Sequence, residues 1–136
     1  VVMIVIVTNG FYLLLVKDYK YIIIKKTRKF AIREELSTHF KQLAVGNVLL
    51  IGIEHEGAVL IVAEYEIDKC SIGVDSITLD LEPIYNAPIQ NGIRFNEMVY
   101  AKFESYELNQ WAEMLKEKIV KISEKDYLKL AKLLVV

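Results

Sequence analysis

The chain has 136 residues, 54% of them hydrophobic, which fits one folded domain with a single core. Its 17 basic and 18 acidic residues give a formal net charge of −1, so the chain as a whole is not a basic protein. A lone cysteine, Cys70, excludes an internal disulfide framework and favours a reducing compartment. The apolar run Val1–Val7 is too short to span a bilayer, so we expect a cytoplasmic protein. The abundance of Lys and Glu beside Ile, Val and Leu resembles thermophile usage.

Strands are expected where aromatic and β-branched residues concentrate. These segments are Met3–Thr8, Phe11–Val16, Lys20–Ile24, Val48–Ile53, Ala58–Ile67, Ser76–Leu81 and Val99–Phe103. The dipeptide Asn9-Gly10 predicts a tight turn after the first strand, and Glu54–Gly57 predicts the turn of a hairpin. Ser76–Leu81 alternates between apolar and polar residues, which indicates a half-buried strand whose apolar face is Ile77, Leu79 and Leu81.

Helices are expected where apolar residues recur at helical spacing. These segments are Arg33–Leu43, Glu107–Leu115 and Glu124–Leu134. Gly46 ends the first by allowing a turn with positive φ. Ser123 is a ready N-cap for the last, with Asp126 at the position where Glu or Gln is preferred.

The remaining segments indicate loops. Asp68–Asp75 is polar, and Pro83 and Pro88 bracket a stretch that cannot continue a central strand ladder. Five to seven short strands with helices between and after them predict an α+β fold, without the alternation or phosphate loop of a doubly wound sheet. A small twisted sheet that closes into a barrel with flanking helices fits these lengths. No repeat or composition break divides residues 1–136, so we expect a single domain.

Positive charge is concentrated in one segment, Lys17–Arg33, here called the basic tract. It holds seven of the 17 basic residues, and Asp18 is its only acid. Aromatic residues, among them Tyr21 and Phe30, interrupt the charges. Such a segment attracts phosphates, and flat side chains beside it can stack on bases. The alternative is a solvated segment whose charges only keep the protein soluble.

Three passages of the chain resemble the EVE domain family. Ile6–Asn9 is similar to a first strand that ends in a short polar motif. Tyr21–Asn47 has two aromatics nine residues apart, then a helix, then a turn that keeps the glycine of the family's Val-Lys-Pro-Gly-Asp but lacks its proline and aspartate. Trp111–Leu134 resembles the closing helix. The resemblance spans nearly the whole chain, and it implies a short helix before Phe30 where the residues themselves have strand propensity.

The resemblance implies a PUA-like barrel with a pocket that reads modified nucleobases in DNA or RNA. Tyr21 and Phe30 fall where the family usually has tryptophans, and Trp111 has a plausible counterpart. Ile4 falls where the family often has a further aromatic, which is absent here.

We therefore expect a nucleic-acid-binding module with no catalytic residue, metal or cofactor. Aromatic side chains can sandwich a flipped base, although core aromatics bury similar areas without binding anything. The candidates are Lys25, Lys26, Arg28 and Lys29 for the phosphate backbone, Thr8 and Asn9 for a base edge, and Tyr21, Phe30 and Trp111 for stacking.

Two other classes of function stay open. One is a small enzyme acting on a nucleotide-like ligand, which should show a converging acid, base and nucleophile. His39, His55 and Cys70 are not spaced like a metal site and carry no nucleophile signature. The carboxylates between Asp68 and Glu82 are expected to serve solubility. The other class is a structural protein that forms homo-oligomers through its apolar termini, Val1-Val2 and Leu133–Val136.

Overall fold

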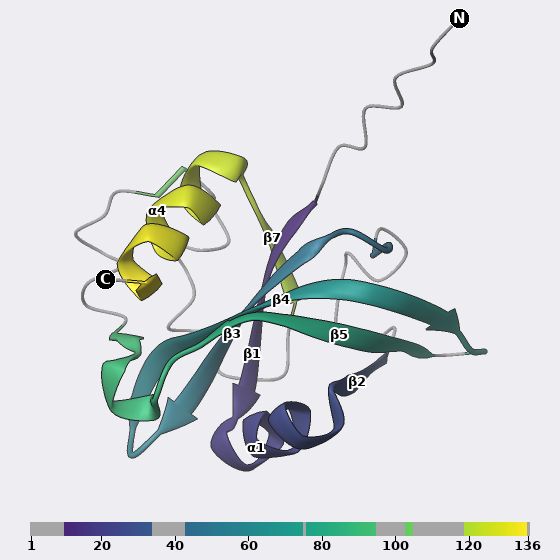
Figure 1. Cartoon of the computed structure of the whole chain (residues 1–136), viewed down its shortest axis with the longest axis horizontal. Coiled ribbons are helices and arrows are strands. Elements are labelled where there is room, and N and C mark those ends of the chain that lie inside the picture. Colours follow the sequence, from purple (N-terminus) through teal and green to yellow (C-terminus); the bar gives the residue numbers. More distant parts are fainter. Residues whose placement is uncertain (1–9, 34–42, 75, 95–102, 105–118, 136) are drawn as a thin grey trace, which may run out of the picture.

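The computed structural model describes residues 10–33, 43–74, 76–94, 103–104 and 119–135 (Figure 1). Four predicted elements lie wholly or mostly outside these residues: Met3–Thr8, Arg33–Leu43, Val99–Phe103 and Glu107–Leu115. Of the helices within the described ranges, none is long and apolar enough to cross a membrane.

Strands dominate the described structure, with a helix near each end. In chain order the elements are β1 (Phe11–Lys17), α1 (Asp18–Thr27), β2 (Lys29–Arg33), β3 (Val48–His55), β4 (Ala58–Ile72), β5 (Ser76–Asn86), the 3-10 helix η3 (Ile89–Asn91), β6 (Ile93–Arg94), β7 (Ile119–Ile122) and α4 (Glu124–Val135). Three of the strands, β2, β6 and β7, are not predicted by the sequence pattern, because each is short.

The seven strands form one sheet in the order β2-β5-β4-β3-β1-β7, with β6 paired to β4. The β1–β3 pair is parallel and the other pairs are antiparallel. Long β4 and β5 twist across the centre of the molecule (Figure 1). The fold is α+β and mostly β, as predicted. Closure into a barrel is not shown, because no pair between described strands joins β2 to β7.

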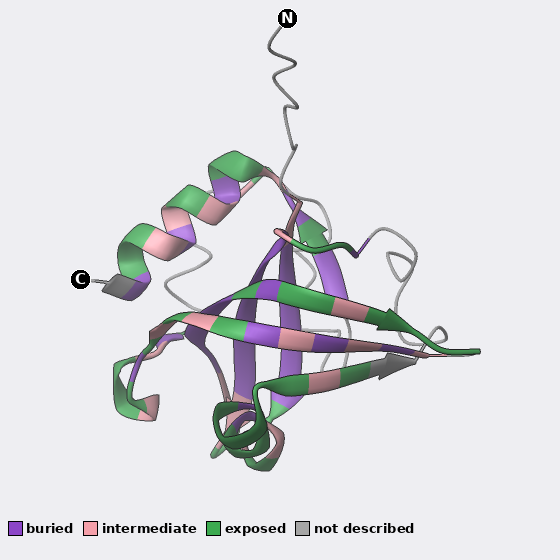
Figure 2. Cartoon of the chain, turned by 45° about the vertical axis from the view of Figure 1, so that its right-hand side comes forward, coloured by how far each residue is buried: buried purple, intermediate pink, exposed green. Residues whose placement is uncertain are grey.

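Buried residues line the central strands of the sheet (Figure 2), and their apolar side chains form one cluster on each face. The face toward α1, here called the α1 face, buries Tyr21 and Ile24 against the strands. The opposite α4 face buries Leu130 and Leu134. Alternate residues of each strand serve the two faces, which is the pattern of a sheet covered on both sides. The predicted apolar face of β5, with Leu79 fully buried, lies on the α1 face.

Helix α1 occupies a segment, Lys20–Ile24, for which strand propensity predicts a strand. That prediction is wrong, and the helix implied by the EVE resemblance is present. Tyr21 and Ile24, three positions apart, are both buried on one side of the helix. The helix ends at Arg28, whose left-handed φ of 56° lets its N–H bond to the Ile24 carbonyl at 2.7 Å. Tertiary packing has therefore overridden the strand propensity of three consecutive isoleucines.

The predicted turns at two glycines are present. Gly46 has a φ of 90° between Leu43 and β3. The β3–β4 hairpin turns at Glu56 and Gly57, both with positive φ (49° and 78°), the geometry of a two-residue type I′ turn. Strand β3 runs closer to this turn than predicted, since it ends at His55, and β4 begins at Ala58 as predicted.

The predicted loops on either side of β5 are partly wrong. Strand β4 continues to Ile72, so Asp68–Ile72 is strand and not loop. Strand β5 continues to Asn86 and includes Pro83, which pairs with Tyr65 beside a register shift. A proline is tolerated there because β2 pairs only with the first five residues of β5, Ser76–Asp80, which leaves the rest of that edge without a described strand neighbour.

The N-terminus of α4 is capped as predicted. The Ser123 hydroxyl oxygen accepts the Asp126 N–H at 3.1 Å. Asp126 itself is fully buried, and its carboxylate accepts the Glu104 N–H at 2.8 Å.

We expect Ser123→Ala to lower the free energy of unfolding by about 1 kcal/mol because the cap is removed, whereas Ser123→Thr should retain most of this stability because threonine also caps helices. Urea denaturation of the two variants measures the difference, and equal stabilities would exclude a capping role.

Candidate nucleic-acid interface

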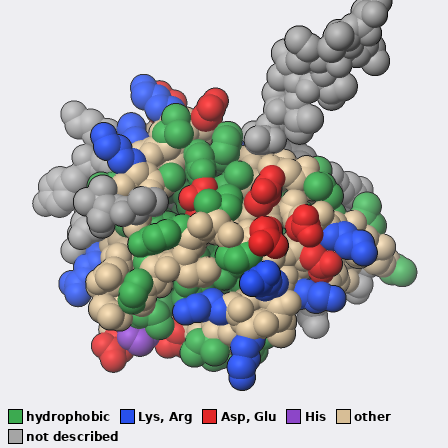
Figure 3. All heavy atoms as spheres, in the orientation of Figure 1, with side chains coloured by type: hydrophobic (Ala, Val, Ile, Leu, Met, Phe, Trp, Pro, Cys, Tyr) green, Lys and Arg blue, Asp and Glu red, His purple; other side chains and the backbone are tan. Residues whose placement is uncertain are grey.

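The basic tract folds as α1 followed by β2, and its predicted phosphate-binding residues share one surface. Lys25 and Lys26 lie in the last turn of α1, and Arg28 and Lys29 lie at the α1–β2 junction. All four side chains are exposed. Figure 3 shows Lys and Arg side chains grouped over this part of the molecule, in the lower half of the view. We call these four residues the α1–β2 surface.

Two carboxylates of β5 lie near the cations of this surface, at the long end of the range for ion pairs. The Arg28 guanidinium lies 3.8 Å from the Glu82 carboxylate, and the Lys29 ammonium lies 3.9 Å from that of Asp80. Three of these four side chains are more than half exposed. Exposed pairs at such distances contribute little free energy and are screened by salt. Both cations are therefore available to a phosphate group that comes near.

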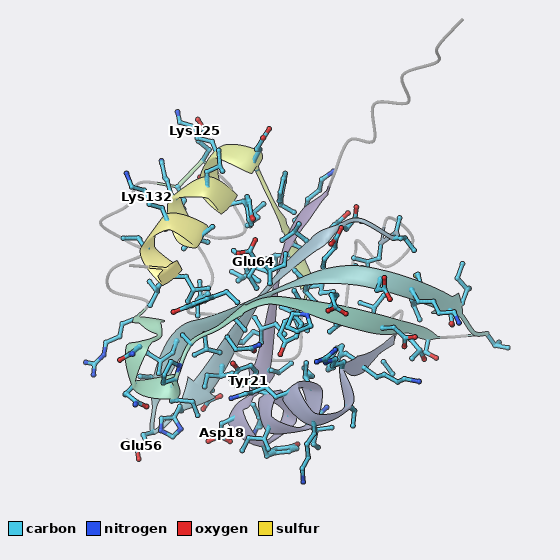
Figure 4. All side chains as sticks on the ribbon, in the orientation of Figure 1. Asp18, Tyr21, Glu56, Glu64, Lys125 and Lys132 are labelled. Atoms are coloured by element: carbon cyan, nitrogen blue, oxygen red, sulfur yellow. The ribbon has the colours of Figure 1, made fainter. Side chains whose placement is uncertain are left out.

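Tyr21, a predicted stacking residue, is a core residue with a polar end. Only 1% of it is exposed, and its ring lies between α1 and the sheet (Figure 4). Its hydroxyl donates to the Asn86 side-chain carbonyl at 3.1 Å, and the Lys25 ammonium lies 5.2 Å from its ring centroid. Burial, with a smaller contribution from Tyr65, raises the pKa of Tyr21 far above its ordinary value.

The other predicted stacking residues are only partly placed. Phe30 lies in β2 opposite Leu79 of β5, and it is half-buried against the core of the α1 face. Part of its ring is thus accessible next to the α1–β2 surface. Trp111, Thr8 and Asn9 lie outside the described residues.

Two residues that sequence reasoning missed complete a cluster with Tyr21. The hydroxyl of Tyr65, also 1% exposed, donates to the Asn86 side-chain carbonyl at 2.7 Å. Burial raises the pKa of Tyr65, while the bond to Asn86 and the charge of Arg28 act in the opposite direction. Asn86 is exposed at the end of β5. We call Tyr21, Tyr65 and Asn86 the tyrosine–asparagine cluster; no sequence motif marks it.

The α4 face carries a different polar contact. Glu64 of β4 is 4% exposed, and its carboxylate accepts a hydrogen bond from the Tyr127 hydroxyl of α4. The Tyr127 ring stacks on Phe11 with centroids 4.3 Å apart. Burial and the neighbouring Glu64 raise the pKa of Tyr127 well above its ordinary value. In Figure 4 Glu64 lies between α4 and the strands, so this contact joins α4 to the sheet away from the basic tract.

Within the described part of the chain, the candidate metal-binding and nucleophilic residues do not lie close together. His55 Nδ1 lies 3.2 Å from the Asp18 carboxylate, and the Cys70 thiol lies 3.8 Å from the Leu43 carbonyl. Burial raises the pKa of the Cys70 thiol, which disfavours the reactive thiolate. In the described ranges no three His, Cys, Asp or Glu side chains group as metal ligands. His39 lies outside those ranges.

Comparison with known proteins identifies the fold. No family model and no curated protein matches the sequence. The structure resembles that of a hypothetical protein from Leishmania major, with a TM-score of 0.71 and 10% identity over 94% of this chain and 96% of that one. It also resembles the crystal structure of a mutant of ZmASCH from Zymomonas mobilis, with a TM-score of 0.61 and 8% identity over 90% and 96% of the two chains.

At such identities the likeness concerns the fold alone. The ZmASCH neighbour, an ASCH domain, supports a PUA-like fold for this chain. The predicted PUA-like fold is thereby supported, and the likeness does not distinguish the EVE family from other families with that fold.

Proposed function

We propose that this chain is a nucleic-acid-binding module whose α1–β2 surface holds the phosphate backbone. The observation that carries the proposal is the placement of Lys25, Lys26, Arg28 and Lys29, exposed together at one end of α1 in a chain of net charge −1. A cation that neutralises a phosphate releases condensed counterions, and this release favours binding. The PUA-like fold agrees with the proposal, because the EVE resemblance implies a base-reading use of that fold.

The proposal includes capture of one base beside the α1–β2 surface. Phe30 is the stacking candidate within the described structure, since its ring is part-exposed and lies one residue from Lys29. Trp111, Thr8 and Asn9 remain proposed partners of that base. Closure of the sheet into a barrel, a single domain over residues 1–136 and a preference for a modified base belong to the same proposal.

Replacing Lys25, Lys26, Arg28 and Lys29 together with glutamine tests the backbone contact. The fold should survive, because exposed charges contribute little to stability. The slope of log affinity against log salt should become shallower by roughly 0.7–0.9 for each phosphate that the variant no longer neutralises. Fluorescence anisotropy on single-stranded and duplex oligonucleotides, with and without modified bases, at a series of salt concentrations measures this slope.

A matched control removes four charges from elsewhere. Arg94, Lys121, Lys125 and Lys132 are exposed and lie outside the basic tract; Figure 4 shows two of them, Lys125 and Lys132, on α4. Their replacement with glutamine should leave the salt slope near that of the unmodified protein. An equal decrease in both variants would mean that only net charge matters, and an unchanged slope in the first would remove the α1–β2 surface from the mechanism.

A further inference from the structure

The tyrosine–asparagine cluster combines two buried tyrosines with one exposed asparagine. Two buried phenols from different elements, Tyr21 of α1 and Tyr65 of β4, both donate to one oxygen, Asn86 Oδ1, at 3.1 and 2.7 Å. Asn86 itself is exposed at the end of β5. The interior of the protein therefore fixes the orientation of a side chain whose other end faces outward.

The two bonds decide what Asn86 can offer. A carbonyl oxygen has two lone pairs, and here each receives one phenol. Burial raises the pKa of Tyr21 and of Tyr65, so both phenols keep their protons and remain donors over the physiological pH range. The amide nitrogen, by contrast, has no hydrogen-bond acceptor within the described part of the chain. The Asn86 side chain can therefore donate hydrogen bonds through its amide nitrogen, but its carbonyl oxygen has no lone pair left to accept one.

The cluster also adjoins the α1–β2 surface. The Lys25 ammonium lies over the Tyr21 ring, and the charge of Arg28 acts on the Tyr65 phenol. The Arg28 carbonyl accepts the Leu81 N–H at 2.7 Å, which fixes the α1–β2 junction against β5, the strand that ends at Asn86. The Tyr21 ring thus joins the Lys25 ammonium to the Asn86 side chain, so a nucleic-acid strand held at Lys25 would run near the Asn86 amide.

We infer that Asn86 is a donor-only contact for the edge of an unpaired nucleobase, an inference that rests on the proposed function and names its base-reading residue. Asparagine normally recognises adenine with both ends, accepting from N6 and donating to N7. Here the accepting end is occupied, so that pairing is excluded. The amide instead suits edges with adjacent acceptors, such as O2 and N3 of cytosine or O6 and N7 of guanine.

Asn86→Asp tests the inference with little change in shape. The carboxylate still accepts both phenols, but the donor is replaced by an acceptor. The matched control is Gln90→Glu, which adds the same charge at an exposed position of η3. Affinities for oligocytidine and oligoadenosine of equal length give a ratio in which the general effect of charge cancels. We expect a cytidine preference that falls about tenfold in Asn86→Asp and is kept in Gln90→Glu.

Tyr65→Phe tests the same point from the other side. Removing one phenol removes one of the two bonds that hold Asn86 Oδ1 inward, so the amide can turn and present its oxygen, and adenosine binding should improve relative to cytidine. Tyr21→Phe should act in the same way, and it replaces Tyr65→Phe if circular dichroism shows that Tyr65→Phe is unfolded. An Asn86→Asp protein that is folded and keeps the cytidine preference of Gln90→Glu would overturn the inference while leaving the salt-dependent backbone contact intact. Absence of any binding by the unmodified protein would overturn the proposed function as well.

Discussion

Truncating Tyr21 to alanine should lower the free energy of unfolding by about 3–5 kcal/mol, the range for large aromatic side chains in a core. The ring is 1% exposed between α1 and the sheet, so its removal leaves a cavity. The same change removes a hydroxyl from Asn86 and a ring from beneath the Lys25 ammonium. Thermal and urea denaturation monitored by circular dichroism measure the decrease.

The control is Tyr21→Phe, which keeps the ring and should cost only about 1 kcal/mol for one hydrogen bond. Oligonucleotide titration on the same samples separates folding from binding. If Tyr21→Ala kept its melting temperature and bound oligonucleotides more weakly, the ring would be a wall of a base pocket, as the sequence resemblance implies, and its place in the core would be wrong.

Alkaline pH should unfold the protein steeply. Burial raises the pKa of Tyr12, Tyr21, Tyr65 and Tyr127 in the folded state. The unfolded chain releases these protons near pH 10, where the folded chain still holds them. The unfolded state then binds fewer protons, so stability is complete below about pH 10 and falls as the pH rises.

The size of this effect follows from the number of buried phenols. Each contributes up to about 1.4 kcal/mol per pH unit while it stays protonated in the fold, Tyr127 less because it is partly exposed. A domain of ordinary stability, about 5–15 kcal/mol, should therefore unfold between about pH 11 and 13. Tyrosinate absorbance and circular dichroism should change together. Ionisation of all tyrosines near pH 10 with a native spectrum would contradict the expected burial.

The sheet could be predicted from the sequence wherever one strand carries enough pattern by itself. Strands β1, β3 and β4 are apolar runs next to glycine turns, and β5 alternates strictly over its first half. By contrast β6 and β7 have two and four residues, too few for a periodicity. Propensity misses helix α1 because three consecutive isoleucines favour a strand, and only packing of Tyr21 and Ile24 on the sheet decides the helix.

The candidate site could be predicted only in its charged part. The α1–β2 surface is local in sequence, so counting residues finds it. The tyrosine–asparagine cluster joins Asn86 to Tyr65, which lies 21 positions earlier in the chain, and to Tyr21, which lies 65 positions earlier. No rule of sequence spacing can bring these three residues together. Asn86 also precedes Ala87-Pro88 and has the sequence context of an ordinary loop residue. Its importance depends on two phenols that the fold places against it.

The position of Pro83 has a consequence for how molecules of this protein meet one another. Beyond the first five residues of β5 the strand has no described neighbour on its outer side, and such an edge is a template for adding a strand from another chain. Proline at position 83 cannot donate a backbone hydrogen bond there, and the charge of exposed Glu82 opposes a close approach. These two residues make this part of the sheet a poor nucleus for edge-to-edge aggregation.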